Sequence, residues 1–330
     1  MTRAIAAALL TAAVVVVVGA GAWFSFATYG QRNLPERTTN VVIPRGSTTS
    51  DVAEVLHRDG VISSPFAFRV LLRVRGLDRR VEAGEYLFTP RESLDEIVRK
   101  LVEGKARVAT WVTIPEGYTA AQIARDLAGH RLGSESAYRD YFDHTSIELG
   151  GVRTKSLEGY LFPSTYLFPL AATPAQAADI LVDQFRKELP SDAAAQARRM
   201  GYTLPEIVTV ASLVEREAKA DDERALIAGV IYNRLHKGMP LDVDASIEYV
   251  FAHHKTEITR ADLRINSPYN TYLHAGLPPT PIANPGLPSL LASLHPRHSD
   301  YYYYVYKGNG HHAFARTLQE HEANVSRYLR

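Results

Sequence analysis

The chain has no cysteine among its 330 residues. This absence excludes thiol nucleophiles, disulfides and cysteine-ligated metals, and it is compatible with an oxidising compartment outside the cytoplasm. A net excess of charge is also missing, because 37 lysines and arginines nearly balance 36 aspartates and glutamates, for a formal net charge of +1. No basic tract stands out, so we expect no nucleic-acid partner.

Several catalytic signatures are absent as well. There is no H-E-x-x-H sequence, and no carboxylate shares a metal-ligand spacing with the histidine pairs. There is no G-x-S-x-G elbow of a serine hydrolase and no glycine-rich phosphate loop. The sequence therefore predicts neither a metal site nor any other cofactor.

Charge is missing from the N-terminal segment, where no charged residue occurs between Ala4 and Gln31. This stretch exceeds the roughly 20 residues needed to cross a bilayer, and aromatic residues gather at its far end. We expect residues 1–30 to be an uncleaved, single-pass anchor in the cytoplasmic membrane, with the catalytic part on the extracytoplasmic side. A cleavable signal peptide is the alternative, since the Ala-Gly-Ala at 20–22 resembles a cleavage site.

After a short polar tether at 31–40, one pattern occurs twice. VVIPRGST at 41–48 and VTIPEGYT at 112–119 are each followed by apolar residues at the same spacings. Each copy is typical of a strand, a Pro/Gly turn and an amphipathic helix. We predict a small α+β module at 41–108 and a separate α+β domain at 109–330.

The second domain is predicted to be rich in helices before it becomes extended. Two helices are expected over 204–219 and 223–236, followed by an irregular wall of Pro, Gly, Asn and Tyr at 266–286. The tyrosine run at 301–306 predicts a strand that pairs across a Gly-Asn-Gly turn with 312–314. Its rings belong either to a half-buried strand or to a platform for sugar faces.

The first of these two helices has a glutamate on its apolar side. At about 100° per residue, Glu217 falls between Val210 and Leu213. A carboxylate there is disfavoured unless it is paired, protonated or catalytic, and an ion pair with Arg216 or Arg224 is the plain alternative. The residues expected on the opposite, solvated side are Thr209, Ser212, Arg216 and Lys219.

Glu217 has the features of a glycosidic acid. Cleavage of a glycosidic bond needs a carboxylic acid whose pKa an apolar setting raises toward about 6, so that it protonates the departing oxygen. A hydrolase would add a second carboxylate. Asp244 is the candidate for that role, although no spacing requires it; the other carboxylates considered are Glu158, Glu215 and Asp242.

A series of motifs, all in one order, resembles the endolytic murein transglycosylases of the MltG (YceG-like) type. The motifs are LEGYLFPSTY (157–166), ASLVERE (211–217), VIYNRL (230–235), LDVD (241–244), YNTY (269–272), GLPP (276–279) and IANPG (282–286). The resemblance covers almost the entire chain, including the N-terminal span and a LysM-like module at 41–108. Thr280 and Ser164 depart from residues that are frequent in the family.

The resemblance implies a catalytic role for Glu217, which is the second acid of the family's E-x-E pair. The implied reaction cleaves the β-1,4 bond between N-acetylmuramic acid and N-acetylglucosamine in nascent peptidoglycan strands and leaves 1,6-anhydromuramoyl ends. Strand elongation would thereby end, with peptidoglycan synthases as possible partners. Matching motifs suggest substrate-binding roles for Tyr160, Asn233, Asp244, Tyr269, Asn270, Tyr272, Asn284 and His312.

Two alternatives remain open at this point. The first is a non-catalytic peptidoglycan-binding scaffold at the membrane, for which Glu217 would be dispensable. The second is a muramidase that uses Asp244 as its second carboxylate and releases reducing ends in place of anhydro ends.

Overall fold

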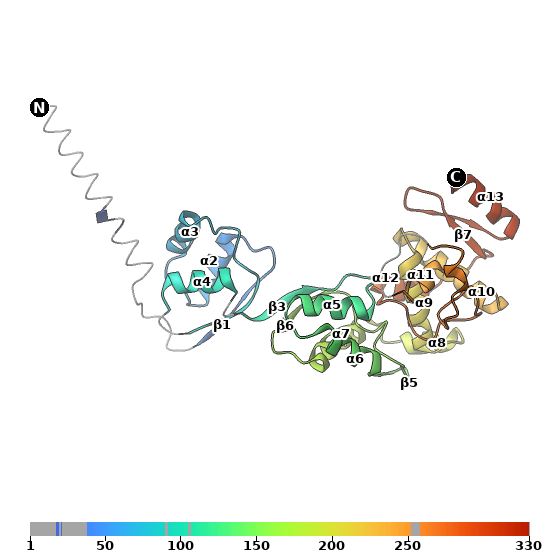
Figure 1. Ribbon diagram of the computed structural model, residues 1–330, viewed down its shortest axis with the longest axis horizontal. Coiled ribbons are helices and arrows are strands. Elements are labelled where there is room, and N and C mark those ends of the chain that lie inside the picture. Colours follow the sequence, from blue (N-terminus) through green and yellow to red (C-terminus); the bar gives the residue numbers. More distant parts are fainter. Residues whose placement is uncertain are drawn as a thin grey trace, which may run out of the picture. The chain divides into compact units, whose positions relative to one another are not determined.

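The computed structural model is α+β and describes residues 18, 19, 21, 38–89, 92–104, 107–251 and 258–329 (Figure 1). The chain divides into two compact units: unit 1 is Met1–Trp111 with Leu167–Ala171, and unit 2 is Val112–Tyr166 with Ala172–Arg330. The predicted junction lies after residue 108, whereas in the structure unit 1 also includes the later segment Leu167–Ala171.

The predicted anchor lies almost wholly outside the described residues. Of residues 1–30, only Val18, Gly19 and Gly21 are described, and they are helical. None of the helices that the structure describes combines the length and the apolar character needed to cross a bilayer. The anchor therefore stays a prediction.

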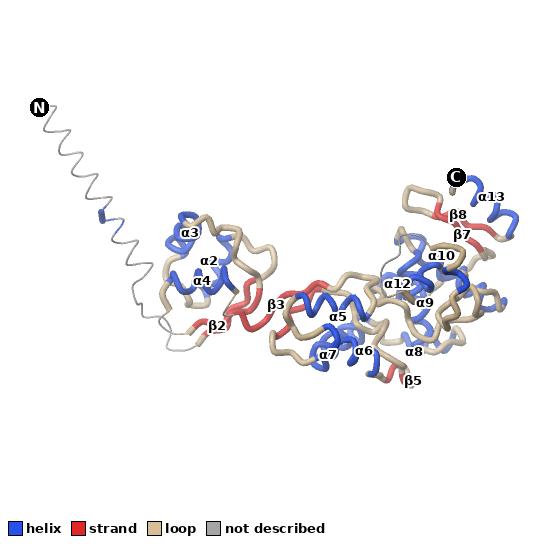
Figure 2. Tube along the Cα trace, in the orientation of Figure 1, coloured by secondary structure: helices blue, strands red, loops and turns tan. Residues whose placement is uncertain are grey.

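Unit 1 contains helices together with strands of a sheet in which the first three strands of the chain pair antiparallel (Figure 2). Its elements are β1 (Thr39–Ile43), α2 (Thr49–Arg58), α3 (Pro65–Val74), β2 (Gly84–Phe88), α4 (Leu94–Glu103) and β3 (Arg107–Thr113). The strand β6 (Thr165–Pro169) follows β3 in the sheet order β1-β2-β3-β6. β1 runs antiparallel to β2, with Val41 opposite Tyr86, and both of these side chains are buried.

Local signals set the ends of the helices in unit 1. The Ser93 side chain accepts a hydrogen bond from the backbone of Glu96, and the Glu96 carboxylate accepts one from the backbone of Ser93, so the two residues form a capping box at the start of α4. The helix ends at Gly104, whose left-handed backbone (φ 66°) favours glycine.

Unit 2 contains the elements that build the candidate site. They are α5 (Ala120–Gly129), α6 (Glu135–His144), β4 (Glu148–Leu149), β5 (Val152–Arg153), α7 (Pro174–Glu188), α8 (Ala193–Arg199), α9 (Leu204–Glu217), the 3-10 turn η1 (Asp221–Glu223), α10 (Arg224–Lys237), α11 (Asp244–Glu248), the 3-10 turn η2 (Asp262–Arg264), α12 (Leu287–Leu294), β7 (Tyr303–Tyr306), β8 (His312–Ala315) and α13 (Leu318–Tyr328). The repeated strand–turn–helix pattern is confirmed, because α5 buries Ile123, Ala124 and Leu127 as α2 buries the matching apolar residues.

The helix α9 is the centre of unit 2, with α8, α10, α11 and α12 packed around it. The prediction that Thr209 and Ser212 face solvent is wrong, since they are 5% and 0% exposed. Their hydroxyls are satisfied inside the protein: Thr209 donates to the Pro205 carbonyl, and Ser212 donates to the Thr209 carbonyl. Polar residues that bond to their own helix can be buried, so periodicity alone misjudged this face.

The C-terminal hairpin follows the prediction closely. Tyr304 pairs with Phe314 and Tyr306 with His312 in the antiparallel β7–β8 ladder. Residues 266–286 contain no helix or strand, as predicted. The helix α9 ends at Glu217, two residues before the predicted end, and this places the candidate acid at the C-terminus of a central helix.

Candidate functional site

Glu217 is half-buried and meets a hydroxyl from the C-terminal hairpin. The Tyr304 hydroxyl of β7 donates a hydrogen bond of 3.0 Å to Oε2 of Glu217. Burial raises the pKa of Glu217 to about 7, and the charge of Asp244 raises it further, while the Tyr304 hydrogen bond and Lys219 act in the opposite direction. The carboxyl group is thus poised to gain or lose a proton near neutral pH.

The arginines that could have neutralised Glu217 have other partners. Arg216 donates to Glu248 Oε2 at 2.8 Å, and Arg224 lies 2.9 Å from Asp221 and 3.3 Å from Glu215. Within the described ranges, no basic side chain forms an ion pair with Glu217. The structure therefore contradicts the ion-pair alternative.

The neighbouring acid, Glu215, has structural partners. Its side chain is only 6% exposed, and its Oε2 accepts hydrogen bonds from the Gly286 backbone at 3.1 Å and the Ser289 hydroxyl at 2.8 Å. These donors lie at the N-terminus of α12, where a negative charge is favoured. Glu215 therefore attaches α12 to the end of α9 and leaves Glu217 as the available acid.

Asp244 and Tyr272 complete a cluster around Glu217. Asp244 begins α11 and is exposed, and the Tyr272 hydroxyl donates a 2.6 Å hydrogen bond to its Oδ1. Burial raises the pKa of Tyr272, as do the hydrogen bond to Asp244 and the charge of Glu217. We call Glu217, Asp244, Tyr272 and Tyr304 the carboxylate–tyrosine cluster; three of its members were predicted from sequence.

Tyr304 is the member that sequence reasoning missed. The tyrosine run predicted a strand but did not distinguish which ring would reach the glutamate. Burial raises the pKa of Tyr304 well above its ordinary value, and the charge of Glu217 adds to this effect, so the hydroxyl keeps its proton as a hydrogen-bond donor. The only available signal was alternation along the strand, which assigns faces and not partners.

His312 packs against the Tyr304 ring and helps to position it. Its ring contacts the Tyr304 ring edge-on at 5.5 Å between centroids. The imidazole is buried and its Nδ1 is 2.9 Å from Glu223 Oε2, while the backbone N–H of His312 donates to the same carboxylate. The predicted substrate-binding role of His312 stays a prediction; its observed contacts are within the protein.

Two predicted binding asparagines hold loops in place. Asn233 is half-buried and donates to the carbonyls of Ser299 and Tyr301 at 2.8 and 2.9 Å. Asn270 is fully buried and its Nδ2 donates to the carbonyls of Leu263 and Ile265. Neither asparagine is hydrogen-bonded to a side chain of the carboxylate–tyrosine cluster, although Asn270 Oδ1 accepts from the backbone of Tyr272 at 2.9 Å.

Asn284 is the centre of a second buried network. Its Oδ1 accepts from the backbones of Gly159 and Leu161 at 3.0 and 2.8 Å, and its Nδ2 donates to the Tyr118 carbonyl at 2.9 Å and to Glu158 Oε1 at 3.0 Å. The amide therefore ties three segments that are distant in the sequence.

Glu158 belongs to the same network, and its carboxylate lies against the N-terminus of α5. Both of its carboxyl oxygens accept from the backbone of Ala120, and the Tyr249 hydroxyl donates to Oε2 at 3.2 Å. Burial raises the pKa of Glu158 to about 8, against the hydrogen bonds that favour its charged form. The following glycine is required, because Gly159 has φ +92° and an added Cβ would lie 2.4 Å from Pro281 Cγ.

The two remaining predicted tyrosines pack in the protein. Tyr160 is 2% exposed and meets Phe185 edge-on at 5.4 Å. Tyr269 shares a 2.8 Å hydrogen bond with the Thr280 hydroxyl and packs at 4.8 Å from the Tyr249 ring. Thr280, one of the departures from the family pattern, therefore has a direct contact with a predicted binding residue.

No metal site is visible in the part of the chain that the structure describes, where no group of three or more His, Asp or Glu side chains is placed to hold an ion. The carboxylate–tyrosine cluster combines one half-buried acid, Glu217, with an exposed aspartate and two tyrosine hydroxyls that donate to these carboxylates, an arrangement suited to proton transfer.

Known proteins resemble this chain over most of its length. The sequence model of the YceG-like family matches residues 41–327. An endolytic murein transglycosylase from Bacillus subtilis is 34% identical over 310 residues, which span 88% of this chain and 85% of the relative. One from Streptococcus pneumoniae is 28% identical over 351 residues, which span 95% of this chain and 63% of that relative. The crystal structure of a YceG-like protein from Listeria monocytogenes superposes with a TM-score of 0.61 at 32% identity, covering 87% of this chain and 98% of that one.

Proposed function

Because the chain belongs to the YceG-like family, we propose that it is an endolytic murein transglycosylase with Glu217 as its catalytic acid and base. The substrate bond is the β-1,4 linkage between N-acetylmuramic acid and N-acetylglucosamine inside glycan strands. The observation that carries the assignment of Glu217 is its half-buried position at the end of α9 with the Tyr304 hydroxyl on its carboxylate, and burial there raises its pKa to about 7. A group with this pKa can give a proton and take one back at neutral pH.

The reaction needs one proton donor and one internal nucleophile. Protonated Glu217 gives its proton to the glycosidic O4 as the bond from the muramoyl C1 breaks. The resulting carboxylate then takes the proton of the muramoyl C6 hydroxyl as O6 bonds to C1. The products are an N-acetylglucosamine 4-hydroxyl and a 1,6-anhydromuramoyl end, and Glu217 returns to its starting state without consuming water.

The other members of the cluster tune this acid. The Tyr304 hydroxyl stabilises the carboxylate formed after the first proton transfer, whereas Asp244 favours the protonated form that begins the reaction. An intramolecular nucleophile supplies effective concentrations of about 10⁵–10⁸ M in well-oriented systems, so no second carboxylate is required. Asp244, exposed and held by Tyr272, is left to bind the substrate or set the local charge.

The location and partners belong to the same proposal. The uncharged N-terminal segment supports a single-pass anchor in the cytoplasmic membrane, with both units on its outer side. There the enzyme would act on nascent strands beside the synthases that make them and end their elongation. Unit 1, with its own buried core and its antiparallel β1–β2 pair, supports a LysM-like module that binds the same glycan.

Mass spectrometry of digested peptidoglycan tests the reaction class. We expect the wild-type protein to produce 1,6-anhydromuramoyl ends from the interior of strands. Asp244→Asn should still produce anhydro ends, because the amide oxygen can accept the Tyr272 hydrogen bond and the muramoyl C6 hydroxyl remains the nucleophile. The negative charge of Asp244 raises the pKa of Glu217, so its removal should also lower that pKa.

The muramidase alternative makes the opposite prediction for the same pair of proteins. With Asp244 as second carboxylate, the wild type would release reducing muramoyl ends. Asp244→Asn would then lose about 10²- to 10⁴-fold in rate. If the wild type releases reducing ends, the protein is a muramidase and the transglycosylase proposal is wrong.

Tyr304→Phe should move the pH profile of cleavage. The free enzyme must begin with protonated Glu217, so kcat/KM should be constant below about pH 7 and fall tenfold per pH unit above it. In the wild type, the hydrogen bond from Tyr304 favours the charged carboxylate of Glu217. Its loss in Tyr304→Phe should raise the pKa of Glu217, so the decrease in kcat/KM should begin about one pH unit higher. The measurement is kcat/KM between pH 5 and 9.

Tyr306→Phe is the matched control on the same strand. Its ring is exposed, and its hydroxyl accepts from the Gly310 backbone at 3.2 Å, away from the carboxylate–tyrosine cluster. This variant should keep the wild-type profile. A shift of the Tyr304→Phe profile toward lower pH would mean that the hydroxyl stabilises the protonated acid, contrary to the proposal.

A further inference from the structure

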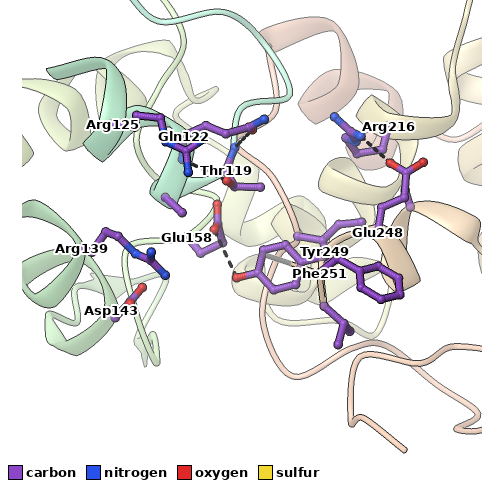
Figure 3. Close-up of a pocket in the computed structure, with 14 residues that line it drawn as sticks. Thr119, Gln122, Arg125, Arg139, Asp143, Glu158, Arg216, Glu248, Tyr249 and Phe251 are labelled. Carbon is purple, nitrogen blue, oxygen red and sulfur yellow. Dashed lines mark hydrogen bonds and ion pairs between the residues drawn. The ribbon is translucent and has the colours of Figure 1, made fainter. Parts of the chain in front are cut away.

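An open pocket of about 420 Å³ lies in unit 2 beside α11 (Figure 3). The helices α5 and α6 supply one wall, with Gln122, Arg125, Arg139 and Asp143. Glu248 and Tyr249, at the end of α11, belong to the opposite wall in the same view. None of the roles derived above uses the charged residues of the α5–α6 wall.

Two guanidinium groups in this pocket have spare hydrogen-bonding capacity. Arg125 lies 3.7 Å from Glu135 and Arg139 lies 4.0 Å from the same carboxylate, and the two arginine side chains are 65% and 52% exposed. One distant carboxylate cannot satisfy two guanidiniums that each carry five N–H donors. The third arginine, Arg216, differs, because Glu248 holds it at 2.8 Å.

The pocket also offers acceptors for a positive charge. Asp143 is exposed on α6 and lies on the same side of the pocket as Arg139 (Figure 3). Glu158, deeper in the wall, is occupied by the backbone of Ala120 and by the Tyr249 hydroxyl. The accessible charges are therefore two arginines and one aspartate, a set that matches a ligand with several carboxylates and one amino group.

The helix α11 connects this pocket to the carboxylate–tyrosine cluster. Its first residue, Asp244, lies in the cluster, and its last residue, Glu248, lines the pocket. Five helical residues span about 7 Å. Arg216, which also lines the pocket, directly precedes Glu217 in the sequence. A substituent on a sugar bound at Glu217 can therefore extend into the pocket.

We propose that this pocket binds the stem peptide carried by the muramoyl residue, with Arg125 and Arg139 binding its carboxylates and Asp143 its amino group. The inference rests on the proposed function, since murein is the polysaccharide whose lactyl groups carry such zwitterionic peptides. A neutral sugar would not need the unfilled guanidiniums. The pocket thus makes cleavage depend on the peptide as well as on the glycan.

The test compares two substrates and three proteins. Glycan strands that keep their peptides and strands stripped by an amidase are digested by the full-length wild type, by Arg125→Gln/Arg139→Gln and by the control Arg186→Gln/Arg199→Gln. The control arginines are similarly exposed, each has one surface carboxylate partner, and both lie outside the pocket.

We expect the pocket variant to lose about 10- to 100-fold in kcat/KM on peptide-bearing strands, because charge-assisted hydrogen bonds are lost. Its rate on stripped strands should be unchanged, and the control should match the wild type on both. Equal cleavage of the two substrates by the wild type, or an equal loss on both by the pocket variant, would overturn the proposal; the second result would indicate a sugar subsite.

A binding experiment separates failure of this proposal from failure of the proposed function. Calorimetric titration with the free tetrapeptide L-Ala–D-Glu–diamino acid–D-Ala needs no cleavage. Binding by the wild type that the pocket variant loses would support the peptide pocket even for a protein that cleaves neither strand. If the wild type does not bind the tetrapeptide, the peptide-pocket proposal is wrong, whatever the cleavage assay shows.

Discussion

Glu217→Gln is expected to lower kcat for strand cleavage by about 10²- to 10⁴-fold. Glutamine keeps the size of the side chain and can still accept the Tyr304 hydrogen bond, but it can neither protonate O4 nor take the C6 proton. Both halves of the reaction therefore fail together. The measurement is the rate of release of anhydromuramoyl ends at pH 6, where the wild-type acid is mostly protonated.

Stability separates loss of chemistry from loss of fold. The pKa of Glu217 is about 7 in the folded protein and near 4.5 when unfolded, so its contribution to stability is present below pH 4.5 and is lost as pH rises through 7. A glutamine at this position does not ionise, so Glu217→Gln does not lose stability as the pH rises. Its free energy of unfolding at pH 8 should exceed that of the wild type by about 1–3 kcal/mol. Thermal melting at pH 5 and pH 8 checks this sign.

The matched control is Glu322→Gln, an exposed glutamate on α13, which should change neither rate nor stability. The scaffold alternative predicts that Glu217→Gln keeps the biological role as well as glycan binding. Full biological activity of a Glu217→Gln protein that still binds glycan would favour the scaffold over the enzyme.

Asn284→Ala is expected to destabilise unit 2 by about 3–5 kcal/mol. The substitution removes four hydrogen bonds, three of them buried and one partly buried, and leaves the N–H groups of Gly159 and Leu161 without their acceptor. The Tyr118 carbonyl loses one of its two donors, since the Asn284 backbone also donates to it. Thermal and urea unfolding followed by circular dichroism measure the change.

Asn266→Ala is the control for this prediction. Asn266 is exposed in the same irregular region, so its replacement should alter the free energy of unfolding by less than about 0.5 kcal/mol. An equally small effect of Asn284→Ala would show that water replaces the amide in the buried network, and the structural role derived above would be wrong.

Local sequence signals predicted the elements of this fold well. Reciprocal capping, as at Ser93 and Glu96, and a left-handed glycine after α10, at Gly238, involve residues within a turn of each other. Such contacts form whatever the rest of the chain does, so the residue types alone indicate where a helix begins and ends. The C-terminal hairpin was predictable for the same reason, from its glycine-containing turn.

The candidate acid was also visible in the sequence, but its surroundings were not. Periodicity placed Glu217 beside apolar residues without showing what neutralises or solvates it. The structure pairs Arg216 with Glu248 and places the Tyr304 hydroxyl on Glu217 across 87 positions of sequence. No spacing rule connects residues so far apart, because their approach depends on how the hairpin packs on the helical core.

By itself, the sequence determined the α+β class, the positions of the helices to within about two residues and the hairpin, and it proposed Glu217 as the candidate acid, since each depends on residue type or on neighbours within one or two turns. Only the tertiary structure decided that every residue from 207 to 214 of α9 is buried, that Glu215 is structural and that Tyr304 reaches Glu217. It alone brought Arg125 and Arg139 to one pocket beside α11. These features depend on long-range packing, in which burial and the choice among competing partners are settled by the whole core at once.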